Sequence, residues 1–70
     1  MKKTDYLSTL FVGIDIGSRT NVVSAIDFNQ NFYIKMKSIP NTQDGTQQLE
    51  SAIACILEAH HEFTYVIIAR

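Results

Sequence analysis

The stretch LFVGIDIGS, residues 10–18, decides the fold. Its first seven residues form a short apolar run rich in β-branched side chains, and a Gly-Ser pair ends it. Such a run is typical of a strand buried on both faces. Side chains alternate along a strand, so one face takes Val12, Ile14 and Ile16, and the other takes Phe11, Gly13 and Asp15. The run therefore predicts a central strand that carries one carboxylate.

Three more strands are predicted from the pattern of apolar residues. Residues 21–28 alternate regularly, and residues 29–31 (Asn-Gln-Asn) form a turn, since asparagine tolerates positive φ. Residues 32–39 also alternate, which predicts one buried face and one solvated face, as at a sheet edge. Residues 65–69 are almost entirely apolar and give the fourth strand.

A helix of about 18 residues is predicted between the third and fourth strands. Asn41 or Thr42 can cap it by accepting a free backbone N–H, and Asp44 suits the positive end of the helix dipole. Gly45 is unfavourable so early in a helix, by about 1 kcal/mol relative to alanine. An apolar stripe with helical spacing comprises Leu49, Ile53, Ile56, Leu57 and His60. This stripe predicts a helix that packs on one face of the sheet.

The order of elements predicts an α/β fold. Three strands with short connections form an antiparallel meander, and a right-handed helical crossover returns the fourth strand parallel to the first. The predicted strand order is 3-2-1-4. Residues 1–9 are interpreted as a flexible polar lead-in, and residues 10–70 as one partial domain. The outer edge of the fourth strand is left open and apolar, which predicts a homo-oligomer that forms through exposed strand edges.

Composition excludes several classes of protein. The chain has 70 residues, 46% of them apolar, which predicts one small globular domain. Its net charge of −1 argues against a strongly basic nucleic-acid-binding protein. A single cysteine, Cys55, excludes an intrachain disulfide, and we interpret it as a packing residue. No signal peptide and no apolar run of the ~20 residues needed for a membrane span are present. We therefore expect a cytoplasmic protein without a membrane partner.

Asp15 is the residue that suggests chemistry. An unpaired charge inside an apolar strand is costly, and a cation would resolve that cost, because Mg²⁺ takes one or two protein carboxylates and keeps several waters. Gly13 beside it leaves room for a ligand, and Gly17 permits a tight turn. The alternative is a solvated strand-end acid that pairs with Arg19 or caps the turn. The residue types alone leave both interpretations open.

The segment FVGIDIGSRTNVVSAIDF, residues 11–28, resembles the first hairpin of the ribonuclease H-like superfamily. Together with PNTQDGTQQL at the start of the predicted helix and TYVIIA in the fourth strand, it resembles the amino-terminal RuvC-like domain of insertion-sequence transposases of the bridge-RNA-guided recombinase type. The resemblance covers residues 11–69.

This resemblance implies a site with four acidic ligands (Asp-Glu-Asp-Asp), of which Asp15 is the first, both catalytic and metal-binding. It implies Mg²⁺, DNA and a guide RNA as partners of a complete protein. The second ligand, a glutamate, falls just beyond Arg70, so the chain is expected to be truncated, to bind metal weakly or not at all, and to be inactive alone. Arg19, Lys35 and Lys37 are candidate nucleic-acid contacts.

Two other functions stay open. The first is the amino terminus of an actin-like ATPase or a sugar kinase, with Asp15, Gly17 and Ser18 in a phosphate loop; the turn at residues 29–31, which lacks glycine, counts against it. The second is a non-enzymatic module that acts by self-association. Asp27 could approach Asp15 in a suitable register, but we favour an ordinary turn-flanking acid.

Overall fold

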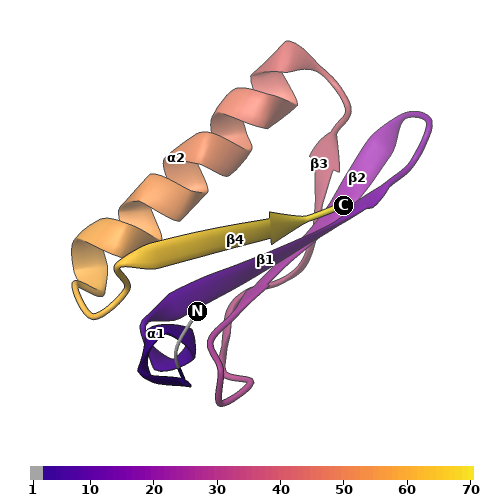
Figure 1. The fold of residues 1–70 in the computed structure, drawn as a ribbon. Helices are drawn as coiled ribbons and strands as arrows, with labels where there is room; N and C mark the ends of the chain where they lie inside the picture. The colour runs from indigo at the N-terminus through magenta and orange to yellow at the C-terminus, as the bar shows by residue number, and fades with distance from the viewer. Residues whose placement is uncertain (1–2) are drawn as a thin grey trace.

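The computed structural model describes residues 3–70 and contains one sheet of four strands and one long helix. The elements are α1 (Lys3–Leu7), β1 (Thr9–Ile16), β2 (Thr20–Ile26), β3 (Phe32–Pro40), α2 (Gln43–Ala59) and β4 (Tyr65–Ala69). The strand order is β3-β2-β1-β4 (Figure 1). β1 and β2 pair antiparallel, as do β2 and β3, whereas β1 and β4 pair parallel. The predicted α/β architecture and strand order are confirmed.

A short helix, α1, lies within residues 1–9, the segment predicted as a flexible lead-in. α1 runs from Lys3 to Leu7, and β1 already begins at Thr9, whose buried hydroxyl donates to the carbonyl of Asp5. The ring of Tyr6 stacks on Phe11 at 6.5 Å and on Phe28 at 5.8 Å between centroids. These contacts join α1 to the sheet. Residues 1 and 2, also in the predicted lead-in, lie outside the described residues.

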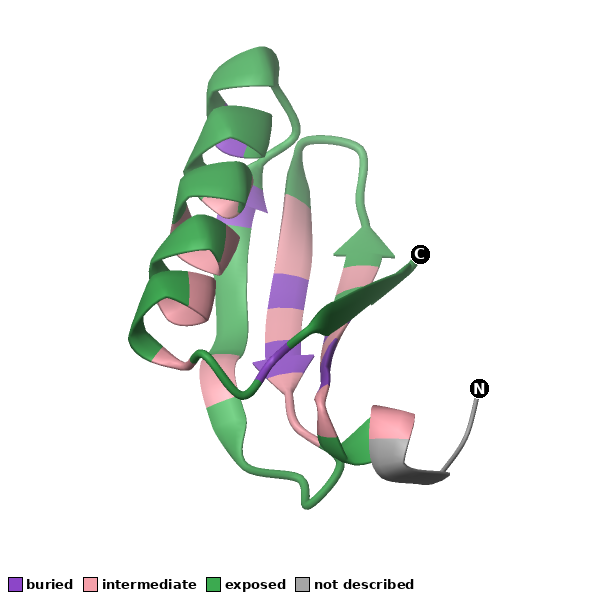
Figure 2. Ribbon diagram, turned by 60° about the vertical axis from the view of Figure 1, so that its left-hand side comes forward, coloured by how far each residue is buried: buried purple, intermediate pink, exposed green. Residues whose placement is uncertain are grey.

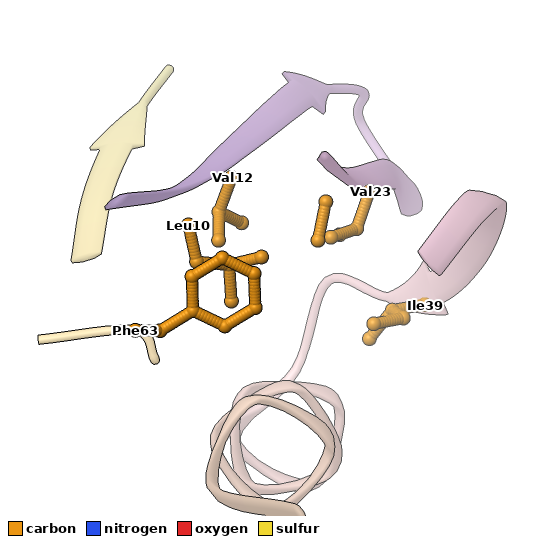
Figure 3. Close-up of a cluster of buried hydrophobic side chains, with 6 residues drawn as sticks. Leu10, Val12, Val23, Ile39 and Phe63 are labelled. Atoms are coloured by element: carbon orange, nitrogen blue, oxygen red, sulfur yellow. The ribbon is translucent and has the colours of Figure 1, made fainter. Parts of the chain in front are cut away.

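The core lies between the sheet and α2. Its buried apolar side chains are Leu10, Val12, Val23, Ala25, Ile39 and Phe63 (Figure 3). The predicted stripe of α2 packs against them through Leu49, Ile53, Ile56 and Leu57. The side-chain alternation predicted for β1 is confirmed, because Leu10 and Val12 face this core.

The prediction that β1 is buried on both faces is wrong. α2 covers only one side of the sheet (Figure 2). On the other side Gly13 and Asp15 are exposed and Phe11 is half-buried. The apolar run therefore reflects one face covered by α2 and a second face that α2 does not cover, where α1 packs only at the end of β1 that contains Thr9 and Phe11. This second face is called the open face below.

The clean alternation predicted for β3 is also wrong. Its pairing with β2 shifts register between Val23 and Ala25 and again between Ala25 and Ile26. Met36 takes a positive φ of 47° at the first irregularity, and its N–H donates to the hydroxyl oxygen of Ser24 at 3.2 Å. Phe32 and Met36 are 54% and 70% exposed, whereas Ile34 packs against the core, so these three side chains do not share one face as predicted.

The start of α2 explains Gly45. Thr42 is the N-cap, as predicted, and its Oγ1 accepts from the Gly45 N–H at 3.2 Å. Gly45 is buried, and a Cβ at this position would lie 1.8 Å from the carbonyl oxygen of Pro40. Glycine therefore lets the first turn of α2 approach the end of β3, which outweighs its low helix propensity.

Candidate functional site

Asp15 lies near the carboxyl end of β1, on the open face of the sheet. It pairs with Val22 of β2, and its side chain is exposed. Gly13 precedes it on the same face, and a Cβ there would meet no atom within 4 Å. The space predicted beside Asp15 is therefore present. The burial argument for a cation is wrong, because an exposed carboxylate is solvated by water and needs no counter-charge.

Asp15 and Arg70 line the same hollow, which has a volume of about 450 Å³. Its other walls are Gly13, Ile14, Val22, Ser24, Met36 and Ala69. Asp15, Ser24 and Arg70 thus border one shallow space at the end of the sheet. Within residues 3–70 the Asp15 side chain forms no ion pair or hydrogen bond, so the predicted pairing with Arg19 is not found.

β4 ends beside Asp15. The parallel register pairs Thr9 with Tyr65 and Gly13 with Ala69. Continuing this register by one residue places Arg70 level with Ile14, and the position after it level with Asp15. A side chain at that position would project on the same face as Asp15, because residues directly paired in a sheet share a face.

The turn after Asp15 is closed by its own backbone. The Gly17 N–H donates to the carbonyl of Thr20 at 3.0 Å and to Oδ1 of Asn21 at 3.3 Å. A Cβ on Gly17 would lie 2.4 Å from that Thr20 oxygen, which confirms the need for glycine. Because the Gly17 amide is already bonded, it is not free to bind a phosphate. This counts against the phosphate-loop interpretation.

Asn41 ties the same turn to the entry of α2. Its Nδ2 donates to the carbonyl of Gly17 at 3.0 Å, and its backbone N–H donates to the carbonyl of Arg19 at 2.8 Å. The predicted alternative role of Asn41, capping α2, belongs instead to Thr42. Sequence reasoning missed this link, because the two segments lie far apart in the chain and only the folded sheet brings them together.

The three candidate nucleic-acid contacts do not form one patch. Arg19 is exposed in the turn next to Asp15. Lys35 lies over the ring of Phe32, with its Nζ 5.7 Å from the centroid. Lys37 lines a different hollow with Asp44 and other polar residues of α2, on the covered side of the sheet. Only Arg19 is therefore placed near the Asp15 end of the sheet by the fold.

Asp27 closes the β2–β3 turn and does not approach Asp15. It follows Ile26, which pairs with Phe11, whereas Asp15 pairs with Val22 further along β2. Its two carboxylate oxygens each accept from Asn31 at 2.9 Å, one from the backbone N–H and one from the side-chain amide. These hydrogen bonds hold the pKa of Asp27 below its ordinary value. The turn-flanking role favoured from the sequence is confirmed.

Two further residues considered in the sequence analysis, His60 and Cys55, both lie on α2 or at its end. His60 is the C-cap of α2, with its ring edge-on to Tyr33 at 4.9 Å and its Nδ1 3.3 Å from the Glu62 carboxylate. Cys55 is exposed, so its interpretation as a packing residue is wrong. Among residues 3–70, no group of three or more histidines, cysteines or acids converges to hold a metal ion.

Comparison of the chain with protein-family models, with curated proteins and with solved structures found no match. In the described part of the chain, neither helix has the length and apolar character required to cross a bilayer.

Proposed function

We propose that Asp15 is one carboxylate ligand of a Mg²⁺ site in a ribonuclease H-like, RuvC-like domain of a DNA transposase. The observation that carries the proposal is the position of Asp15. It lies exposed near the end of a central strand, beside a parallel strand whose next residue would stand level with it. Carboxylates at neighbouring strand ends converge at one edge of a sheet, as a shared metal site requires.

The surroundings of Asp15 suit a phosphate-bearing ligand. Gly13 leaves the face free beside the carboxylate, and Arg70 borders the same hollow. Arg19 follows in the adjoining turn, where its guanidinium is exposed. A cationic side chain near a carboxylate-bound cation would contribute to binding a nucleic-acid backbone. DNA and a guide RNA as partners, and a cytoplasmic location, are further parts of this proposal.

The residues present fit only part of a catalytic metal centre. One exposed carboxylate suffices for a weak, largely hydrated Mg²⁺ ion. Hydrolysis or transfer of a phosphodiester with two metal ions needs several carboxylates around ions ~4 Å apart, and residues 3–70 contribute a single one at this place. We therefore expect the 70-residue chain to be inactive.

A Mn²⁺ titration followed by NMR tests the metal ligand. We expect amide signals of Gly13, Asp15 and Arg70 to broaden first, and Asp15→Asn to abolish this local broadening. Asp44→Asn is the matched control, because Asp44 is an exposed acid at the other side of the sheet and its removal should leave the effect unchanged. Equal broadening in Asp15→Asn and in the wild type would refute the assignment.

The reading frame beyond Arg70 tests the family. A glutamate within the next few codons would stand near Asp15 in the continued register of β4 and would support the four-ligand site. Its absence would reject the transposase proposal, even if Asp15 binds Mn²⁺.

A further inference from the structure

β4 is an unprotected edge of the sheet. It pairs with β1 on one side, and no other strand of residues 3–70 lies on its outer side. Its sequence, YVIIA, contains no charge, no proline and no glycine. Its large apolar side chains are exposed to 45% at Tyr65, 36% at Val66, 37% at Ile67 and 50% at Ile68. An exposed apolar edge of this kind is a template for pairing with another strand.

The opposite edge of the sheet lacks these properties. β3 has two register irregularities, two lysines (Lys35 and Lys37) and a terminal proline, Pro40. Bulges, lysine and proline are the devices by which natural sheets prevent pairing at an edge. The chain therefore blocks pairing at β3 and leaves it available at β4.

The side chains on both faces of β4 are also exposed. Val66 pairs with Leu10 and Ile68 with Val12, so these two side chains lie on the side of α2. Leu10 and Val12 are fully buried, yet Val66 and Ile68 are not, because α2 lies over the other strands and does not reach β4 (Figure 2). Tyr65 and Ile67 lie on the open face. A partner strand would thus gain apolar contacts on both sides.

We infer that β4 pairs antiparallel with β4 of a second copy of the chain, with Ile67 on the two-fold axis. In this register Tyr65 stands opposite Ala69 of the second copy, a large side chain against a small one. Val66 stands opposite Ile68 of the second copy on the α2 side. The combined size of the two side chains is therefore similar in each cross-strand pair, which favours stabilising contacts along the whole strand.

Charge supports the same register. Arg70 follows β4, and Glu62 lies in the turn that precedes it, so the strand is positive at one end and negative at the other. Antiparallel pairing places Arg70 of each copy beside Thr64 and diagonal to Glu62 of the other. A parallel arrangement of the two β4 strands would place like charges together instead.

The dimer is expected to be weak. Five paired residues with half-exposed side chains bury less than the about 800 Å² per partner of a standard interface. The two-fold axis stands perpendicular to the sheet, which joins the two sheets into one of eight strands with both α2 helices on the same side. The association should therefore depend on protein concentration.

Disulfide cross-linking tests the pairing and its register. In a Cys55→Ser background, which removes the exposed native thiol, Ile67→Cys places two thiols directly opposite each other, with Cα atoms about 4.5–5.5 Å apart, within disulfide range. Tyr65→Cys is the matched control on the same strand and face, since its copies would lie more than ~10 Å apart. Met36→Cys samples the open face away from β4.

We expect Ile67→Cys to form a covalent dimer about tenfold faster than either control, because only its thiols meet the distance requirement. Light scattering on the unmodified chain should show monomer and dimer in a concentration-dependent ratio. If Tyr65→Cys cross-linked as fast as Ile67→Cys, the proposed register would be wrong. If Met36→Cys cross-linked as fast, the two copies would instead associate through their open faces. A chain that stays monomeric at high concentration would also overturn the inference and would leave the β4 edge to a strand of another polypeptide.

Discussion

The two faces of the sheet differ in what covers them, although both carry large apolar side chains. On the α2 side, Leu10, Val12 and Val23 are at most 1% exposed. On the open face Phe32 and Met36 are 54% and 70% exposed. Apolar content alone therefore does not indicate which face is the core; the position of α2 decides it.

The largest effect is expected from truncating the covered face. Leu10→Ala should destabilise the fold by about 2–5 kcal/mol, because it leaves a cavity between the sheet and α2. Phe32→Ala, on the open face, removes a larger side chain yet should cost well under ~1 kcal/mol. Urea denaturation at one fixed protein concentration measures both. Equal losses would mean that the open face is buried in solution.

Gly45 and Gly13 make a matched pair, one where α2 contacts the end of β3 and the other on the open face of β1. Gly45→Ala forces a Cβ against the Pro40 carbonyl and should cost about 1–3 kcal/mol, as overpacking does. Gly13→Ala meets open space within a strand and should stabilise by about 0.5 kcal/mol, because alanine has less backbone freedom to lose on folding. Thermal melts of both variants test whether each substitution raises or lowers the stability of the fold. A stabilising Gly45→Ala would contradict the close approach of α2 to β3.

The cap of α2 holds the covering helix in place. Thr42→Ala removes the acceptor of the Gly45 N–H and should cost about 1 kcal/mol. Thr42→Ser retains the hydroxyl and should behave like the wild type in the same urea titration. If Thr42→Ser were as unstable as Thr42→Ala, the loss would come from the Thr42 methyl group and not from the cap.

The smallest effect is expected from Asp27, at the end of the sheet. Its folded-state pKa is lowered by the hydrogen bonds from Asn31, so its contribution is present above the unfolded value of about 3.9 and is lost as pH falls through the folded value. Asp27→Asn should therefore lower the melting temperature slightly near neutral pH and flatten its decline in acid. Asp44→Asn serves as a control. An unchanged acid profile in Asp27→Asn would assign the decline to other carboxylates.

The sequence was sufficient for the architecture because periodicity determines which residues share a face. Val12 and Ile14 were separated correctly from Gly13 and Asp15, and the helical stripe identified the covering side of α2. Periodicity does not show whether a second layer covers the sheet, and for this reason the predicted burial of Asp15 is wrong. Because Asp15 is exposed, the cost of burying a charge does not support a cation there, and the metal-site hypothesis depends on the register of β1 with β4.

Other features depend on contacts between distant segments. The irregularity at Met36 is held by Ser24 on the neighbouring strand, and neither residue type signals a bulge. Asn41 was a plausible cap by composition, but its side chain bonds to the turn at Gly17. The stacking of Tyr6 on Phe11 and Phe28 likewise joins segments that only the fold brings together. Gly45 is different, because glycine is unfavourable in a helix. Its presence in the predicted helix indicates a position where a tertiary contact outweighs helix propensity.

The parallel pairing of β1 with β4 has a consequence for the order of folding. Thr9 pairs with Tyr65, a contact that spans most of the chain, whereas the hairpins β1–β2 and β2–β3 close over short turns. Closing the long loop costs more chain entropy, so we expect the hairpins and α2 to form first and β4 to dock last. At concentrations where the chain is monomeric, β4 should also detach most readily from the native state, and its amide protons should exchange ahead of those of β2.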